Sequence, residues 1–420
     1  MILELKKYIS RLPEKIWFRA MLFSLGAIVA AVAAEWISPL IPYKSDLELA
    51  SGSVGNILTI LASSMLAVIA FSVSIMVSAY SSATSTATPR TIALMLADDR
   101  SQNALSTFLG TFLFSIVGII GLSAGFYDDR GRIILFFATI SVIILITGTL
   151  INWIHQLSTF GRMNDLIQRV EQATAKALRW HGEHPFLHAL PSVEIPSDAV
   201  AVRCDIASGV VTSVDMGDLE EAAEKHGVTV YLVIHPGKLI YPARPLLYLS
   251  GEEAKTLDPK PFQDAILIEH DRSFDQDPRF GLVVLSEIAS RALSPAVNDP
   301  GTAISVLDSG LRCFEALAGA SADPEDPRYS RVHGPEIETR DLFTDFFTKI
   351  ARDGSAMVEV QQRIQLCLLG LAKSWPSLFA VAAAEASRDA LARAIGAIDY
   401  KPDIKDLQSR SEKVVAVGKE

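Results

Sequence analysis

Two stretches in the C-terminal half concentrate residues that could bind a ligand. Residues 269–281 read EHDRSFDQDPRFG, and residues 291–303 read RALSPAVNDPGTA. Arginine side chains and helix N-termini are typical anion-binding groups. In one interpretation two helix N-termini meet here and form a site for a small ion or an anionic, phosphate-bearing ligand. The side chains that would converge on it are Arg272, Arg279, Arg291, Asn298 and Asp299, and the wider set of candidate residues adds Asp271, Asp277 and Ser294.

The alternative interpretation of these stretches is structural. Asp277 and Asp299 each directly precede a proline. Aspartate is a good N-cap acceptor, and proline is tolerated at the first helical position because its missing N–H is not needed there. The spacing therefore predicts two helices that begin at these points, with Arg279 or Arg291 paired to nearby carboxylates. The aspartates within 271–277 count against a site for an anion.

Three histidines, His181, His184 and His188, lie within eight residues, and histidine is a common zinc ligand. Gly182 and Pro185 interrupt the helix that would present them on one face, which favours a solvated turn and no metal site. The sequence holds no phosphate-binding lysine loop, no GxGxxG, no HExxH and no GxSxG motif. We therefore predict no catalytic residue, no cofactor and no enzymatic activity.

Composition divides the chain into an apolar part and an acidic part. Of 420 residues, 50% are hydrophobic and 20% are charged. Residues 1–160 hold 10 Lys and Arg against 9 Asp and Glu, whereas residues 161–420 hold 28 against 39. The acidic remainder argues against nucleic acid as a partner, because phosphate binding needs a basic surface. The three cysteines are far apart, which indicates reduced structural thiols in a cytosolic setting.

Four apolar stretches are long enough to span a bilayer, at 20–37, 56–80, 105–126 and 133–154. The positive-inside rule places their basic ends in the cytoplasm, and with them both termini. A cleavable signal peptide over residues 1–34 is the alternative interpretation of the first stretch. The basic residues that set this orientation are Lys6, Lys7, Arg11, Lys15, Arg19, Arg90, Arg100, Arg162 and Arg169.

The second span carries a stripe of small and hydroxyl side chains at steps of three or four residues from 56 to 88, which is one helix face. The stripe is either a packing seam, matched by the small and hydroxyl residues from Thr107 to Gly125 in the third span, or the lining of a hydrated path in a homo-oligomer. Few ionisable groups lie at membrane depth, so proton coupling and voltage sensing have little support. The candidate stripe residues are Asn56, Thr59, Ser63, Ser74, Ser78 and Ser81.

Four N-terminal spans, the tripeptide Thr88-Pro89-Arg90, and the strings DQDPRFG at 275–281 and ALSPAVNDP at 292–300 occur together. In these features the chain resembles the bacterial predicted-membrane-protein family called domain of unknown function 2254, over nearly its full length. Gly301 departs from the larger residue expected at that position. The resemblance implies a topology and supplies no activity.

The sequence predicts an α-helical membrane domain with four transmembrane helices and an α+β cytoplasmic domain. Its parts are the membrane domain over 1–158, a helical stalk and linker over 159–196, a small β-rich module over 197–260 and a mainly helical domain over 261–420. The fourth span should continue as one helix to about 181, residues 321–337 should form a polar loop, and the last twenty residues should fray.

We expect a multi-pass protein of the bacterial inner membrane that contacts the lipid bilayer and forms a homo-oligomer. The favoured function is a channel or passive transport protein with a cytoplasmic gating or assembly domain. The alternative is a non-conducting scaffold or sensor whose cytoplasmic domain binds a ligand or partner. The sequence names no transported species, oligomer number or gating signal.

Overall fold

The structure is a computed structural model that describes residues 18, 20–22, 24–26, 28–29, 53–204, 208–320 and 328–418. It divides into two compact units. The membrane unit holds the described residues up to Ser85 together with Ile92–Asp165, and the large unit holds Thr86–Thr91 and the residues from Leu166 onward. Each unit is described by itself below.

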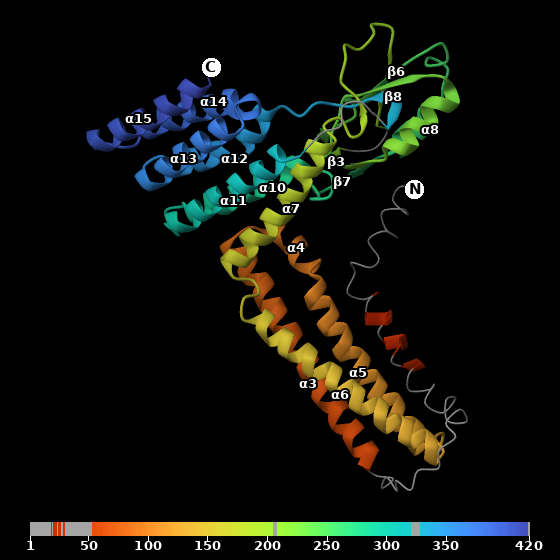
Figure 1. Ribbon diagram of the computed structural model, residues 1–420. Helices are drawn as coiled ribbons and strands as arrows, with labels where there is room; N and C mark the ends of the chain where they lie inside the picture. Colours follow the sequence, from red (N-terminus) through yellow and green to blue (C-terminus); the bar gives the residue numbers. More distant parts are fainter. Residues whose placement is uncertain are drawn as a thin grey trace. The chain divides into compact units, whose positions relative to one another are not determined.

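Three helices of the membrane unit are long and apolar enough to cross a membrane: α3 (Ser53–Thr86), α5 (Asp99–Ser123) and α6 (Asp129–Leu157). They run alongside one another in Figure 1, and the short helix α4 (Ile92–Leu96) precedes α5. The first predicted span, 20–37, and the signal-peptide alternative lie largely outside the described residues. The other three predicted spans are therefore present as helices, each longer than its apolar stretch.

Side chains from the three helices pack around Leu58, Phe114 and Leu135. Gly118 lets α3 and α5 approach closely, because an added Cβ would lie 2.9 Å from a Leu58 methyl group. Trp153 on α6 is buried, and its Nε1 donates a hydrogen bond of 2.8 Å to the Ser72 hydroxyl on α3. A buried indole N–H usually finds such a partner, and this bond links α6 to α3.

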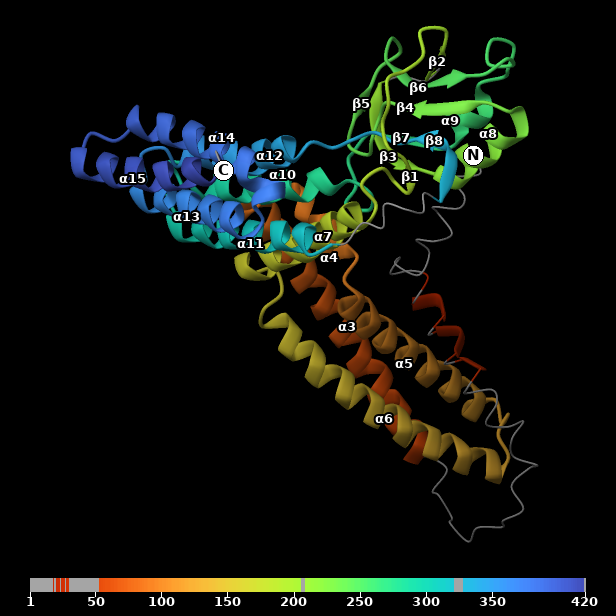
Figure 2. The same cartoon turned by 45° about the horizontal axis from the view of Figure 1, so that its top comes forward.

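The β strands of the large unit form two sheets (Figure 2). The five-stranded sheet has the order β1 (Ala189–Leu190), β8 (Tyr329–His333), β4 (Thr229–Leu232), β6 (Pro245–Ser250) and β2 (Val200–Arg203). The three-stranded sheet has the order β5 (Leu239–Ile240), β3 (Gly209–Val214) and β7 (Ile266–Glu269). Their core includes Val211, Val230 and Phe262, and the helices α8 (Met216–His226) and α9 (Lys260–Asp264) belong to the same part.

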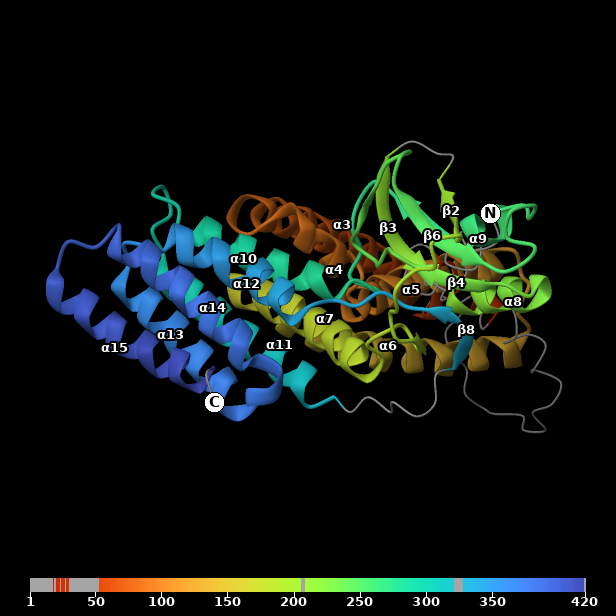
Figure 3. The same ribbon diagram turned by 90° about the horizontal axis from the view of Figure 1, so that it is seen from above.

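The remaining helices of the large unit form a bundle, seen from above in Figure 3. Phe314 packs against the rings of four other phenylalanines, with centroid distances from 4.7 to 6.0 Å, so an aromatic cluster fills its core. The helices are α7 (Met163–Glu183), α10 (Pro278–Ala292), α11 (Pro300–Ala318), α12 (Thr339–Asp353), α13 (Val358–Ser374), α14 (Pro376–Ile395) and α15 (Lys401–Val417).

Three local predictions were wrong. The fourth span does not continue as one helix, because α6 ends at Leu157 and Gly161 turns the chain with a φ of 74° before α7 begins. The 321–337 segment is not all loop, since Tyr329–His333 forms β8 between β1 and β4. The end of the chain does not fray before residue 418, because α15 buries Leu407 and Val414. The strands β1 and β8 also lie outside the range 197–260 expected for the β-rich module.

Candidate functional site

The first candidate stretch is organised around Asp277, whose side chain is only 1% exposed. It is the N-cap of α10, as predicted, and accepts hydrogen bonds of 3.1 Å from the backbone N–H groups of Arg279 and Phe280. Arg272 donates to the same carboxylate from Nε and Nη2, at 2.7 and 3.0 Å. Gly237, with a φ of 91°, packs so closely on this pair that no Cβ would fit. The carboxylate is therefore fully engaged and has no room for a ligand.

The residues that follow Asp277 fasten α10 to its neighbours. Arg279 binds two carboxylates of α12, at 2.5 Å to Asp341 and 2.6 Å to Asp345. Gly281 lies directly against the Thr174 side chain of α7, and an added Cβ would overlap it. Each of these contacts joins helices that are far apart in the sequence, so the DQDPRFG string assembles the bundle.

The second candidate stretch forms the turn between α10 and α11. Asp299 caps α11, as predicted, and accepts hydrogen bonds from the Thr302 backbone N–H at 3.0 Å and from its hydroxyl at 2.6 Å. These bonds hold the pKa of the Asp299 carboxyl below its usual range. Asn298 adopts the left-handed conformation with a φ of 50°, which asparagine tolerates better than most residues. The Ser294 hydroxyl is used within the turn, because it donates to the Arg291 carbonyl oxygen at 2.7 Å.

The structure does not bring the two stretches together. Arg272 and Arg279 lie near the start of α10, whereas Arg291 and the turn to α11 lie at its end. At 1.5 Å per residue the helix separates them by roughly 20 Å. Arg291, Asn298 and Asp299 are exposed. Asp271 is also exposed and outside the capping network. The geometry therefore gives no common anion site made by the five converging side chains.

The six stripe residues of α3 are all exposed in the single chain: Asn56, Thr59, Ser63, Ser74, Ser78 and Ser81. The buried face of α3 includes Leu58, Met65 and Met76, whereas Leu66 and Phe71 of the same helix are exposed. In α5, by contrast, Thr107, Thr111 and Ser115 are buried within the chain. The two polar faces therefore do not form a seam with each other, and the α3 stripe is open to a partner outside the described chain or to lipid.

The connection after α3 belongs to the large unit. Ala87, Thr88 and Thr91 are buried there, with Pro89–Thr91 in a short 3₁₀ helix. Arg90 makes a 2.7 Å ion pair with Glu287 of α10. No pattern in the sequence indicated Glu287, because it lies on a helix face whose partners are remote in the chain.

The three histidines lie in different surroundings. His181 is buried in α7, contrary to the expected solvated turn, and burial lowers its pKa to about 4, with a further contribution from nearby His235. The rings of His184 and His188 lie against each other, tilted by 49°, beside Trp180. Across the described residues, no group of three or more His, Cys, Asp or Glu side chains is arranged to hold a metal ion.

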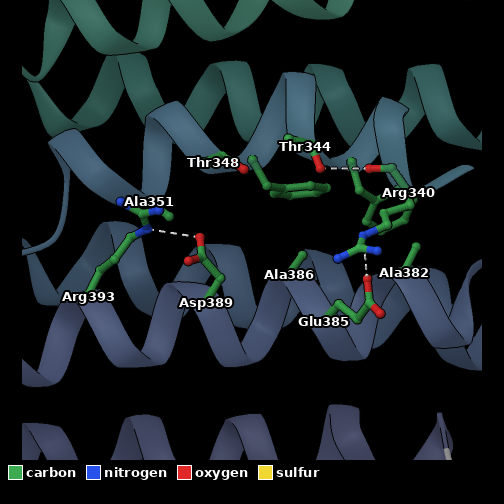
Figure 4. Close-up of a pocket in the computed structure, with 11 residues that line it drawn as sticks. Arg340, Thr344, Thr348, Ala351, Ala382, Glu385, Ala386, Asp389 and Arg393 are labelled. Carbon is green, nitrogen blue, oxygen red and sulfur yellow. Dashed lines mark hydrogen bonds and ion pairs between the residues drawn. The ribbon is translucent and has the colours of Figure 1, made fainter.

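A groove of about 250 Å³ lies between α12 and α14 (Figure 4). Its lining includes Phe343 and Phe347, and no pattern in the sequence indicated this groove. One end carries the ion pair of Arg340 with Glu385 at 3.0 Å, and the other carries Arg393 with Asp389 at 2.8 Å. The arginines are therefore paired within the groove, which suits an apolar or amphipathic occupant better than a free anion.

Comparison with known proteins gives the family. The profile described as a predicted membrane protein, DUF2254, matches residues 13–369, and the chain belongs to this family. Uncharacterised proteins of Mycobacterium bovis and Mycobacterium tuberculosis are 26% identical to it over 345 residues, which cover 78% of this chain. The matched region spans 65% of the length of those relatives. No solved structure matches the chain.

Proposed function

We propose that the chain assembles into a homo-oligomer in the bacterial inner membrane and acts as a channel or passive transport protein. The proposal includes no catalytic residue, and residues 160–420 serve as a cytoplasmic gating or assembly domain. The observation that carries the proposal is the exposure of the stripe residues from Asn56 to Ser81 on a helix that buries Leu58, Met65 and Met76.

The physical argument starts from what this face can pack against. Thr59, Ser63 and Ser74 each donate a hydrogen bond of 2.7 to 2.9 Å to the carbonyl oxygen four residues earlier, so their hydroxyls are satisfied within the helix. Small side chains allow a second helix to approach closely. A second copy of the chain is the partner that membrane assembly supplies most directly, and copies arranged around an axis would line a hydrated path with hydroxyl groups.

The orientation is part of the proposal and rests on charge. Arg90 and Arg100 follow the second span, and Arg162 and Arg169 follow the fourth, which favours a cytoplasmic position for these ends and for both termini. The proposal gives Cys313 and Cys367 no catalytic role, because burial raises the pKa of the Cys367 thiol to about 12 and raises that of Cys313 as well.

Thiol accessibility together with reconstitution tests the proposal. In a cysteine-free background, Ser63→Cys, Ser74→Cys and Ser78→Cys should react with a small charged thiol reagent in the membrane. Leu66→Cys and Phe71→Cys are matched controls, because both positions are exposed apolar positions on the same helix and should stay unreactive against lipid. The purified protein should also pass ions in liposomes. No reaction at the three serines, combined with no flux, would remove the channel.

The α12–α14 groove favours a second candidate, a non-conducting scaffold or sensor. In that case a ligand or partner would occupy the groove lined by Phe343 and Phe347. Replacing Ala386 in the groove wall with Trp should then abolish the response to that ligand without changing oligomer size. Reagent access and flux that survive Ala386→Trp unchanged would favour transport over sensing.

A further inference from the structure

The short connection from α3 to α4 is built into the large unit, although both helices that it joins lie largely in the membrane unit. The membrane unit stops at Ser85 and resumes at Ile92, and Thr86–Thr91 clusters with the large unit. Within the connection, Ala87, Thr88 and Thr91 are each less than 5% exposed. The chain therefore enters the large unit directly after α3 and leaves it again within six residues.

One carboxylate holds this connection in place. Glu287 on α10 accepts a 2.7 Å hydrogen bond from Arg90 Nη1, and the Thr88 hydroxyl lies 3.4 Å from the same oxygen. Lys349 on α12 lies 3.9 Å from the other oxygen of Glu287. The carboxylate thus contacts Arg90 and Thr88 of the connection and lies near Lys349 of the bundle. These contacts therefore depend on how α10, α12 and the connection are placed relative to one another.

The Arg90–Glu287 ion pair is partly exposed, which allows it to break and re-form. The Arg90 side chain is 50% exposed and that of Glu287 is 23% exposed, so water and salt screen their attraction. A buried pair would act as a permanent clamp, whereas a partly solvated pair can break and re-form at low cost. The adjacent backbone has little freedom to absorb a displacement, because Pro89 fixes its own φ.

We propose that the Arg90–Glu287 pair is a latch that transmits the conformation of the α10–α12 bundle to the end of α3. The stripe residue Ser81 lies only nine residues before Arg90, so a shift of α10 would move the end of the helix that carries the stripe. As a regulator of transport the latch rests on the proposed function. As a mechanical link it does not.

Hydrogen–deuterium exchange on the full-length protein in nanodiscs tests the mechanical link. The variants are Arg90→Glu, Glu287→Arg and the double charge swap. Arg100→Glu is the matched control, because Arg100 is an exposed arginine ten residues later in the chain. Each single reversal should speed amide exchange in the last turns of α3, residues 78–86, by about two- to fivefold. The double swap should return the rate at least halfway to wild type. Glu287→Gln replaces Glu287→Arg if the latter does not accumulate.

The proposal is overturned if faster exchange stays confined to residues 87–91, or if the double swap behaves no better than the single variants. Ion flux in liposomes is measured separately on the same proteins. If the wild-type protein shows no flux, the proposed transport function is refuted, and the exchange data still test the mechanical link. A conducting wild type whose flux neither single reversal alters would refute the latch as a regulator.

Discussion

Replacing Arg272 with alanine should destabilise the large unit more than any exposed arginine replacement. The variant leaves the Asp277 carboxylate, which is 1% exposed, with two backbone N–H donors but no cation. Breaking a buried ion pair by removing one partner costs about 3–5 kcal/mol, because the remaining charge is buried without compensation. Arg272 also lies 5.0 Å from the centroid of the Phe280 ring, and its loss opens space beside this buried side chain.

The assay is thermal unfolding of the full-length protein in detergent, followed by circular dichroism. For a unit of this size, about 1 kcal/mol lowers Tm by roughly 2–4 °C, so Arg272→Ala should lower it by about 10 °C. Arg393→Ala is the matched control. Asp389 lies four residues before Arg393 on α14, and because this pair is partly exposed it contributes about 0.2–1 kcal/mol.

A third variant separates the lost charge balance from lost packing. Asp277→Asn keeps an N-cap acceptor and removes the negative charge, so Arg272→Ala combined with Asp277→Asn should recover most of the lost stability. The reasoning is refuted if Arg272→Ala lowers Tm no more than Arg393→Ala does. It is also refuted if the double variant is as unstable as the sum of the two single variants.

Three further predictions use the same assay. Gly281→Ala should destabilise the large unit by about 1–3 kcal/mol, because the added Cβ overlaps Thr174. Gly370→Ala is the control and should be neutral or stabilising, because nothing lies within 4 Å of its added Cβ. Equal effects of the two variants would contradict the close approach of α7 and α10. Asp299→Ala should cost about 1 kcal/mol and Asp299→Asn almost nothing, and an asparagine variant that folds but loses transport would reveal a function for the carboxylate. The pKa of His181 is about 4 in the folded protein, below its value in the unfolded chain. Between these two values the unfolded chain binds the proton and the folded protein does not, so the free energy of unfolding should fall by up to about 3 kcal/mol as the pH falls from 6.5 to 4. His181→Phe should remove that component and His270→Gln should not; parallel pH profiles for wild type and His181→Phe would contradict the assignment.

The sequence predicted those features whose causes are local. Asp277 and Asp299 could be read as N-caps because aspartate, proline and the first helical turn are adjacent in the chain. The three described membrane helices followed from apolar length alone. Each of these features depends on a window of fewer than about thirty residues, within which composition and spacing carry the information.

Features that depend on distant partners could not be predicted in this way. The strand β8 pairs with β4 across about one hundred residues, and neither its short length nor its polar flanks mark it as central to a sheet. Arg279 was expected to bind a nearby carboxylate, but its partners Asp341 and Asp345 lie on another helix more than sixty residues later. The helix α15 was mistaken for a frayed tail because its apolar residues are few, although its Ser411 hydroxyl forms a buried hydrogen bond with Ser387 on α14.

The motif that carries the family resemblance and the features that carry the functional proposals lie in different places. The residues of the DQDPRFG string around Asp277 cap a helix, form ion pairs and make close contacts between helices. A motif of this kind specifies a bundle and leaves no open group for a ligand. The α3 stripe and Arg90 are instead exposed or half-exposed, so they remain free to change partners. Because a change of contacts between two states is what a gate or a sensor requires, function should be sought along the chain from Asn56 to Arg90 and at its anchor Glu287.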